Sequence, residues 1–532
     1  MKLFAAELLV DRLADWGVDT VFGLPGEQDE GLAAALAARA GEIRLVRVQH
    51  EEAAAFMATG YAKATGRPGV CLATSGPGAV HLLNGLYDAK LDHQPVLAVT
   101  ELEEGRVLGT AFHADIHLDK LFEDVAGYNV RVDVPVQISA VVDIALGHAI
   151  AKGTVSHITF PPGLDSDAEG GYWVARTPAT APVFLSSPGV PPDADLERAA
   201  ATLNQGTRRA MLVGVGAFGA RSELLAVAER LASPIVKSLP GKAAVPDDHP
   251  LSTGCIGALG TRPAEDALAG ADALLVVGTN FPWTRHLPDP GKVRTVQIET
   301  DLTRVGAPTP TEAPLVGDAA ETLQALLPLL DQAEDRSFLD QAQHGMARWR
   351  ERLAALEDPG TPVRPRYLAR VVDQLASSNA ILTSDSGSSA TWSAHHFDVR
   401  AGRHYLLSAN LTMMTAGLPY AIAAQWAHPK RQVIAFVAAD GFAKLMAELL
   451  TAVHHQLPVK VVIANPAQPA DGRPPDFACW ATACGALGAR AERADEVPEA
   501  IRAAFVHPGP AVVDVLVGPD EPERAGAASA KE

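Results

Sequence analysis

Two stretches that lie far apart in the chain follow the same order of strand, glycine-containing turn, helix and strand. The first is VCLATSGPGAVHLLNGLYDAKLDHQPVLAVT at 70–100, and the second runs from VIAFVAADGF to VVIANP at 433–466. When Gly78 is aligned with Gly441, Pro95 falls on Pro458. A helix between two strands is the connection that parallel strands require. The repeat therefore predicts two domains of the same kind, which we expect to face each other across a common site.

Strands and helices alternate along the whole chain, which is typical of parallel sheets covered on both faces. Two linkers rich in Pro and Gly, at 165–195 and 356–366, interrupt the alternation. The predicted fold class is α/β, with three doubly wound parallel-sheet domains. We place the domains at 1–165, 190–335 and 365–520, followed by a polar tail at 521–532.

Charge and composition exclude several classes of partner. The net charge is −19 and the pI is about 5.3, and no basic stripe offsets this acidity, which argues against binding to nucleic acid or to anionic membranes. No apolar run approaches the length of a membrane span. The 4 cysteines are scattered, which argues against a disulfide framework and against a zinc site. We expect a cytoplasmic protein.

Two oxygen-bearing side chains follow neighbouring strands of the predicted third domain. Asp440 ends one apolar run, and Asn465 ends the next, 25 residues later. Such side chains at adjacent strand ends are suited to hold a hard cation and, through it, a phosphate. Pro466 follows Asn465 and offers neither a side-chain oxygen nor an N–H. The pattern leaves open whether this is a working metal site or the remains of one.

One acidic residue of the first domain stands where a helix begins. Glu51 follows the apolar run IRLVRV and opens an alanine-rich helix. A carboxylate there stabilises the positive end of the helix dipole by up to about 1 kcal/mol, and Glu52 is equally suited to that role. From the residues alone, Glu51 is therefore a weak functional signal.

Several motifs together resemble the thiamine diphosphate (ThDP) enzymes, in particular the pyruvate oxidase and acetolactate synthase group. The similarity begins in the first domain with GLPG, QHEEAAAFMATGYAKATGRPGVCLATSGPG and NGLYDAKLDHQPVLAVT. It continues through LVGVGAFGA and GTNFPW to the C-terminal VVDVLV, so it covers nearly the whole chain. The first domain would bind the pyrimidine ring of ThDP, and the third would bind its diphosphate.

The resemblance implies a role for each matching residue. Glu51 would hydrogen-bond the pyrimidine and favour its imino tautomer, and Met414 would be the apolar wedge that bends the cofactor. Asp440 and Asn465 would bind Mg²⁺, with Pro466 in place of a second asparagine, and the loop that follows is about 20 residues shorter than in the family. The residues implied to contact ThDP are Pro25, Gly26, Glu51, Ser386, Gly387, Thr412, Met414, Asp440, Gly441 and Asn465.

A second departure from the family lies in the loop GTAFHADIHLDKLF at 109–122. Relatives have an aromatic-Phe-Gln-Glu run here that lines the reaction site, whereas this chain has Phe112-His113-Ala114-Asp115. His113 is thus a candidate catalytic residue that contacts substrate, and it is equally well an ordinary loop histidine.

The predicted middle domain contains Gly214-x-Gly216-x-x-Gly219 between a strand and a helix. The next strand lacks the terminal acidic residue of an NAD site, so a structural use of these glycines is at least as well supported. In pyruvate oxidase relatives this domain binds FAD, although some family members bind no flavin. The positions that the resemblance assigns to FAD are Gly214, Gly216, Gly241, Lys242, Gly278, Thr279, Asn280, Glu299 and Asp318.

The resemblance implies ThDP- and Mg²⁺-dependent decarboxylation of a 2-keto acid such as pyruvate, with FAD as an optional cofactor. Oxidation or carboligation of the enamine would follow. Because the two ThDP half-sites meet between subunits in the family, we expect a homodimer or homotetramer. The alternative, favoured by Pro466, is a degenerate homologue without ThDP catalysis that acts as a flavoprotein, a partner subunit or an enzyme of altered chemistry.

Overall fold

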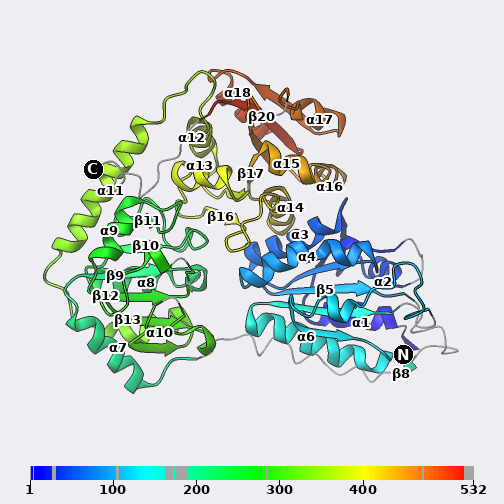
Figure 1. The fold of residues 1–532 in the computed structure, drawn as a ribbon, viewed down its shortest axis with the longest axis horizontal. Coiled ribbons are helices and arrows are strands. Elements are labelled where there is room, and N and C mark those ends of the chain that lie inside the picture. Colours follow the sequence, from blue (N-terminus) through cyan, green and yellow to red (C-terminus); the bar gives the residue numbers. More distant parts are fainter. Residues whose placement is uncertain are drawn as a thin grey trace.

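The computed structural model describes residues 2–3, 5–26, 31–103, 107–161, 172–173, 189–279, 281–282, 284–307, 309–469 and 472–519. These residues form three six-stranded sheets with flanking helices. The sheets lie at the corners of a triangle, with the first domain at the lower right, the middle domain at the left and the third at the top (Figure 1). The predicted α/β fold with three parallel-sheet domains is confirmed.

The first domain has a parallel sheet of order β3-β2-β4-β5-β7-β6. Apolar residues such as Val70 and Leu72 of its strands pack against α1, α2 and α6 on one face, and α3 and α4 cover the other. Its strands are β2 (Thr20–Leu24), β3 (Arg44–Arg47), β4 (Gly69–Ala73), β5 (Val96–Glu101), β6 (Ala126–Arg131) and β7 (Val155–Phe160). Its helices are α1 (Ala5–Asp15), α2 (Leu32–Ala38), α3 (Glu51–Thr65), α4 (Pro77–Leu91), α5 (Leu118–Leu121) and α6 (Ile138–Lys152).

A short antiparallel pair, β1 (Lys2–Leu3) and β8 (Tyr172–Trp173), joins the start of the chain to the segment after the first domain. The rest of the predicted linker at 165–195, up to residue 188, lies outside the described residues.

The middle domain has the parallel order β11-β10-β9-β12-β13-β14, which changes direction between β9 and β12. Its strands are β9 (Arg209–Val213), β10 (Ile235–Lys237), β11 (Ser252–Cys255), β12 (Ala273–Val277), β13 (Arg294–Glu299) and β14 (Ala313–Val316). Its helices are α7 (Asp193–Gln205), α8 (Arg221–Arg230), α9 (Arg262–Gly270), α10 (Ala319–Leu326) and α11 (Ser337–Ala355). Ligands of open α/β sheets bind at such a change of direction.

The third domain repeats the topology of the first, with the parallel order β16-β15-β17-β18-β20-β19. Its strands are β15 (Ile381–Ser384), β16 (His404–Leu407), β17 (Val433–Ala438), β18 (Lys460–Pro466), β19 (Leu487–Ala491) and β20 (Ala511–Val517). Its helices are α12 (Pro365–Leu375), α13 (Ser388–His396), α14 (Gly417–Ala427), α15 (Ala439–Leu445), α16 (Glu448–His454), α17 (Phe477–Ala483) and α18 (Val497–Val506). The aligned repeat of the sequence thus occupies equivalent strands, β4–β5 and β17–β18.

The first and third domains share one hydrophobic core, which lies where α3 packs against α14. The rings of Phe56 and Tyr420 meet edge to face at 6.4 Å, and a side chain at Gly60 would overlap Tyr420. Lys63 donates to the carbonyl of Leu407 at 2.7 Å across the same interface. The two domains therefore form a continuous packed unit within one chain.

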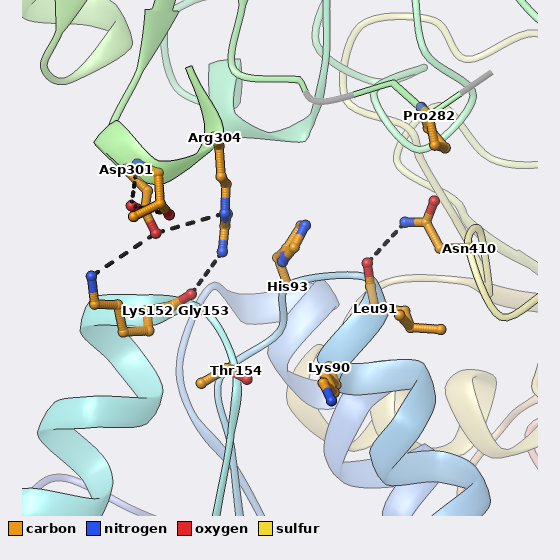
Figure 2. A pocket seen from close by; sticks show the side chains of 11 residues that line it. Lys90, Leu91, His93, Lys152, Gly153, Thr154, Pro282, Asp301, Arg304 and Asn410 are labelled. Carbon is orange, nitrogen blue, oxygen red and sulfur yellow. Dashed lines mark hydrogen bonds and ion pairs between the residues drawn. The ribbon is translucent and has the colours of Figure 1, made fainter. Parts of the chain in front are cut away.

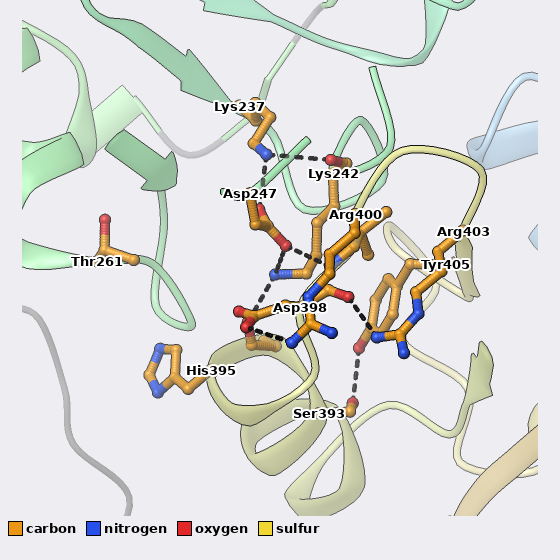
Figure 3. A network of polar contacts seen from close by, with 12 residues as sticks. Lys237, Lys242, Asp247, Thr261, Ser393, His395, Asp398, Arg400, Arg403 and Tyr405 are labelled. Carbon is orange, nitrogen blue, oxygen red and sulfur yellow. Dashed lines mark hydrogen bonds and ion pairs between the residues drawn. The ribbon is translucent and has the colours of Figure 1, made fainter. Parts of the chain in front are cut away.

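A buried ion cluster joins the middle domain to the third (Figure 3). Asp247 Oδ1 lies 2.6 Å from Lys237 Nζ, and Asp247 Oδ2 lies 2.8 Å from Lys242 Nζ. Lys242 also donates to the carbonyl of Ala394 on α13, and Val399 N–H donates to Asp247. Lys237 is 0% exposed, so the cluster excludes water and fixes the two domains together.

None of the helices in the described part of the chain is long and apolar enough to cross a membrane.

Candidate active site

The carboxyl ends of the strands in the first sheet bring several predicted residues together. Pro25 and Gly26 follow β2, Glu51 opens the helix after β3, and Gly78 lies just beyond β4. A Cβ atom at Gly26 would lie 3.5 Å from Thr74, and one at Gly78 would lie 2.9 Å from the hydroxyl of the same threonine. The loops after β2 and β4 thus meet at Thr74. We call this edge the pyrimidine half-site.

Glu51 is held in place by a histidine that the sequence analysis missed. His81, the fifth residue of α4, has its Nδ1 2.9 Å from Glu51 Oε2, and its ring stacks on that of His50 with centroids 4.4 Å apart. The Glu51 side chain is 16% exposed, so it is mostly enclosed yet still reachable. A carboxyl in such a setting is suited to exchange a proton with a bound ring nitrogen.

A second carboxyl at this edge was also missed. Glu101 ends β5, and its carboxylate accepts a hydrogen bond from the N–H of Gly26. Burial raises the pKa of Glu101, and the Gly26 hydrogen bond partly opposes that rise. An acidic residue directly after the apolar run PVLAVT was the available signal, because strand ends at this edge carry the other predicted residues.

His113 lies in an exposed loop that covers the edge of the pyrimidine half-site. Its ring contacts that of Phe112 at a centroid distance of 4.3 Å. The same loop reaches the turn after β4, because a Cβ atom at Gly76 would lie 2.7 Å from Ala114. The candidate catalytic role of His113 stays a prediction, supported by its place in this covering loop.

Three segments of the third domain converge at the equivalent edge of its sheet. Ser386, after β15, donates its N–H to the carbonyl of Met413 at 3.0 Å, and Gly417 N–H donates to Asp385 Oδ1 at 2.8 Å. Gly441, at the start of α15, packs so closely that a side chain would overlap the carbonyl of Met414 and the carboxyl of Asp385. We call this convergence the diphosphate half-site.

The diphosphate half-site offers N–H groups and open space for an anion. Gly387 has φ 97° and precedes α13, and a Cβ atom there would meet nothing within 4 Å. The N-cap of α13 is Gly387, which has no side chain to bond the first N–H groups of the helix, and such groups can bind phosphate oxygens. Thr412, whose φ is 58°, and Met414, which is 37% exposed, both lie at the surface of the single chain.

Asp385 is a buried carboxyl at the centre of the diphosphate half-site. Burial raises its pKa well above the usual range, and the charge of Asp440 adds to that rise although two backbone N–H groups oppose it. Its Oδ2 has no hydrogen-bond partner among the described residues. Asp440 precedes Gly441, which packs on the Asp385 carboxyl, and Asp440 itself is exposed at the first turn of α15.

Asn465 keeps an oxygen available for a metal. It is 1% exposed, and its amide nitrogen donates to Asp514 at 2.8 Å and to the carbonyl of Pro475 at 2.9 Å. Its Oδ1 is buried without a partner in the described structure. Pro466 is exposed at the end of β18 and supplies no ligand. The donor set of Asp440 and Asn465 therefore fits Mg²⁺, which keeps waters readily, with one side-chain ligand fewer than in the family.

The glycines predicted to bind FAD pack on one another at the switch point of the middle sheet. A Cβ atom at Gly216 or Gly241 would lie 2.8 Å from the Cα of Gly278 or Gly214, respectively. A Cβ atom at Gly214 would overlap Thr279, and Gly278 has φ 57°. These glycines allow close contact between the loops after β9, β10 and β12, and they do not form an open cradle.

The charged residues predicted for FAD also have partners within the chain. Lys242 points into the interface with the third domain, as described above. Glu299 Oε1 accepts from Thr300 N at 2.8 Å, and Asp318 caps α10. Asn280 lies outside the described residues. These residues do not fit a flavin as they stand, and their assignment to FAD stays a prediction.

A pocket of about 680 Å³ lies where the three domains meet (Figure 2). Lys90 and His93 of the first domain line it, together with Arg304 of the middle domain and Asn410 of the third. Arg304 donates to the carbonyl of Lys152 at 2.9 Å, and Asn410 donates to that of Leu91 at 2.9 Å. The pocket is thus bounded by contacts that bridge the domains.

Fold and site together define a ThDP-dependent enzyme, and comparison with known proteins agrees. Residues 4–121 match the N-terminal TPP binding domain of thiamine pyrophosphate enzymes, and residues 196–326 match the central domain. Residues 385–468 and 465–515 match the C-terminal TPP binding domain in two segments that meet at the departure around Pro466. The chain belongs to the thiamine pyrophosphate enzyme family.

Similar proteins span nearly the whole chain. A putative thiamine pyrophosphate-containing protein, YdaP, of Bacillus subtilis is 34% identical over 97% of this chain and 92% of its own length. Pyruvate oxidase of Lactiplantibacillus plantarum is 31% identical over 87% of this chain and 77% of its own length. A probable acetolactate synthase large subunit of Methanocaldococcus jannaschii is 29% identical, over 97% and 92% respectively. The pyruvate oxidase and acetolactate synthase branch is therefore confirmed.

Proposed function

We propose that this enzyme uses ThDP and Mg²⁺ to decarboxylate a 2-keto acid such as pyruvate. Bound ThDP supplies a carbon nucleophile that accepts the electrons released when CO₂ leaves. The observation that carries the proposal is the Glu51–His81 pair, held at 2.9 Å in a mostly enclosed edge of the first sheet. The equivalent edge of the third sheet offers the complementary site for a diphosphate.

In the pyrimidine half-site, Glu51 would hold a proton against a ring nitrogen of the cofactor. His81 fixes one carboxylate oxygen, and Glu51 Oε1 lies 3.2 Å from the position of a Cβ atom at Gly78. The missing side chain at Gly78 therefore leaves Oε1 accessible. Gly26, held by Glu101, would present its backbone to the same ring.

In the diphosphate half-site, Asp440 and Asn465 Oδ1 would hold Mg²⁺. The start of α13 at Gly387 would donate N–H groups to the phosphates. Met414, at the surface of the single chain, would provide the apolar surface against which the cofactor bends. Waters would complete the metal shell where Pro466 offers no side-chain oxygen.

The second half of the reaction is an oxidation or a carboligation. Relatives named pyruvate oxidase and acetolactate synthase support these two outcomes. FAD is not part of the proposed reaction, because the charged residues assigned to it, Lys242, Glu299 and Asp318, have other partners in the described chain. His113 would approach the keto acid from the covering loop.

Mass spectrometry and absorption spectra of the cofactors released from purified protein test the proposal, together with calorimetric titration of ThDP with and without Mg²⁺. We expect Mg²⁺-dependent ThDP binding and CO₂ release from pyruvate or another 2-keto acid. A flavin spectrum would add FAD to the assignment. Absence of ThDP binding at millimolar concentration would instead support the degenerate homologue that Pro466 suggests.

A further inference from the structure

A buried glutamate of the third domain binds the backbone of the first domain directly before Glu51. Glu448, the first residue of α16, is 0% exposed. Its Oε1 accepts from the N–H of Gln49 at 3.0 Å and from the N–H of His50 at 2.9 Å. Its Oε2 accepts from the hydroxyl of Thr451 at 2.7 Å. Both carboxylate oxygens therefore accept hydrogen bonds, and the bonds to Oε1 join the third domain to the first.

The two N–H groups belong to the entry of α3. His50 is the N-cap of this helix, and Glu51 is its first residue. These donors precede the helix, so an acceptor that holds both of them fixes the direction in which the chain enters it. The side chain of the adjacent residue, Glu51, takes its orientation from that entry.

The groups that affect the charge of Glu448 belong to the first domain and to its own helix. Glu51 repels it, and the N–H groups of Gln49 and His50 and the hydroxyl of Thr451 stabilise its charged form. Burial, with the repulsion by Glu51, raises the pKa of Glu448 to about 7. His81 contacts Glu51 and His50, the two residues at the start of α3.

We propose that Glu448 is a positioning residue for Glu51: its carboxylate clamps the backbone of Gln49 and His50 so that Glu51 meets the pyrimidine ring at the required angle. This inference rests on the proposed function, because it assumes that Glu51 contacts ThDP. Glu448 also lies 8 residues after Asp440 on consecutive helices α15 and α16. The segment that carries a metal ligand therefore also fixes the Glu51 of the same chain.

Another contact between the same domains provides a matched control. Trp426 of α14 donates its indole N–H to the hydroxyl of Thr20 at 2.9 Å. Trp426→Phe removes one interdomain hydrogen bond, whose partner Thr20 lies on β2 and not at the entry of α3. If Glu448 only joined the domains, its loss would resemble the loss of this bond.

The first experiment needs no cofactor. Amide hydrogen exchange of the full chain is measured for peptides that cover residues 49–52, in wild type, Glu448→Ala, Glu448→Gln and Trp426→Phe. We expect exchange in this segment to rise about tenfold or more in Glu448→Ala, because two N–H groups lose a buried acceptor. Glu448→Gln keeps an acceptor oxygen and should stay close to wild type, as should Trp426→Phe. Unchanged exchange in Glu448→Ala would overturn the clamp.

The second experiment reads Glu51 directly, through the rate of C2–H exchange of bound ThDP followed by NMR, together with kcat and KM. We expect Glu448→Ala to slow C2–H exchange and kcat by about 100-fold, the cost of a misplaced catalytic group, with KM changed little. Glu448→Gln should lie within about tenfold of wild type, because a neutral acceptor is weaker than a charged one.

The outcomes separate this inference from the proposed function. If Glu51→Gln abolishes C2–H exchange while Glu448→Ala and Trp426→Phe behave alike, the proposed function stands and the positioning role is wrong. If ThDP does not bind to the wild type, the proposed function is wrong, and so is the inference that Glu448 positions Glu51 against ThDP. Amide exchange then still tests whether Glu448 holds the N–H groups of Gln49 and His50, but that result cannot rescue the inference.

Discussion

Asn465 turns its amide nitrogen toward Asp514, which accepts from it at 2.8 Å on the neighbouring strand β20. A carboxylate accepts hydrogen bonds and the amide nitrogen only donates them, so the Nδ2 of Asn465 faces Asp514 and its Oδ1 points away from Asp514. The oxygen of Asn465 is thereby left buried without a partner in the described part of the chain. A metal at the diphosphate half-site would satisfy that oxygen, which supports the proposal that the site binds Mg²⁺.

Pro466→Asn should tighten the binding of ThDP in the presence of Mg²⁺. The substitution restores an oxygen at the position where the family supplies a metal ligand. A gain of about 1–2 kcal/mol, or roughly five- to thirtyfold in Kd, is expected for one recovered polar contact to a charged group. Calorimetric titration across Mg²⁺ concentrations measures it. Pro469→Asn, which adds the same side chain three residues later, should leave the affinity unchanged, and equal effects of both variants would contradict a ligand role.

Glu51→Gln should lower ThDP-dependent turnover by about 10²- to 10⁴-fold, because the amide cannot exchange the proton. Glu52→Gln is the matched control, since it removes the same charge from the same helix start. Glu52 bonds instead to Asn84 at 2.8 Å, away from the cofactor edge. Steady-state kinetics of both variants should therefore differ strongly. Similar activity in the two would remove Glu51 from the mechanism.

Asp247→Asn should destabilise the contact between the middle and third domains. The substitution leaves the ammonium groups of Lys237 and Lys242 buried with no opposing charge from this residue. Removing one partner of a buried ion pair costs about 3–5 kcal/mol. Urea denaturation monitored by fluorescence measures the loss. Asp289→Asn breaks an exposed pair with Lys292 at 2.5 Å and should leave the urea midpoint nearly unchanged.

The ion cluster of Asp247, Lys237 and Lys242 predicts how the free energy of unfolding depends on pH. Burial raises the pKa of Asp247, but the charges of Lys237 and Lys242 outweigh that effect and lower it to about 2. A carboxylate whose pKa is depressed by folding adds stability above its unfolded pKa of about 4 and loses it as pH falls toward about 2. Thermal midpoints measured from pH 5 to pH 2 should therefore fall more steeply in wild type than in Asp247→Asn. Parallel curves would show that this carboxylate does not titrate as expected.

We expect the enzyme to form at least a homodimer, whose subunits join a pyrimidine half-site to a diphosphate half-site. Met414, the proposed wedge, is 37% exposed in the single chain, and a second subunit would cover it. Sedimentation at micromolar protein should give a multiple of the 55.7 kDa chain mass. A monomer that turns over substrate would contradict this expectation.

The sequence by itself determined the three α/β domains and most of the residues that line the two half-sites. Strand and helix periodicity, glycine turns and linkers are local signals, and the repeat at 70–100 and 433–466 predicted two equivalent domains before any contact was known. Motifs such as GLPG and SGPG predicted the pyrimidine half-site through their resemblance to ThDP enzymes, and residues at the ends of parallel strands do gather at one edge of a sheet.

Only the tertiary structure decided which side chains are partners across helices and domains. His81 reaches Glu51 because α3 and α4 pack side by side, and Glu448 reaches the entry of α3 from almost 400 residues away in sequence. Lys242, predicted as a flavin contact, instead donates to the carbonyl of Ala394 on α13, because the middle domain docks on the third there. Such contacts depend on how whole elements pack, and no periodicity or spacing in the chain encodes the direction of a single side chain.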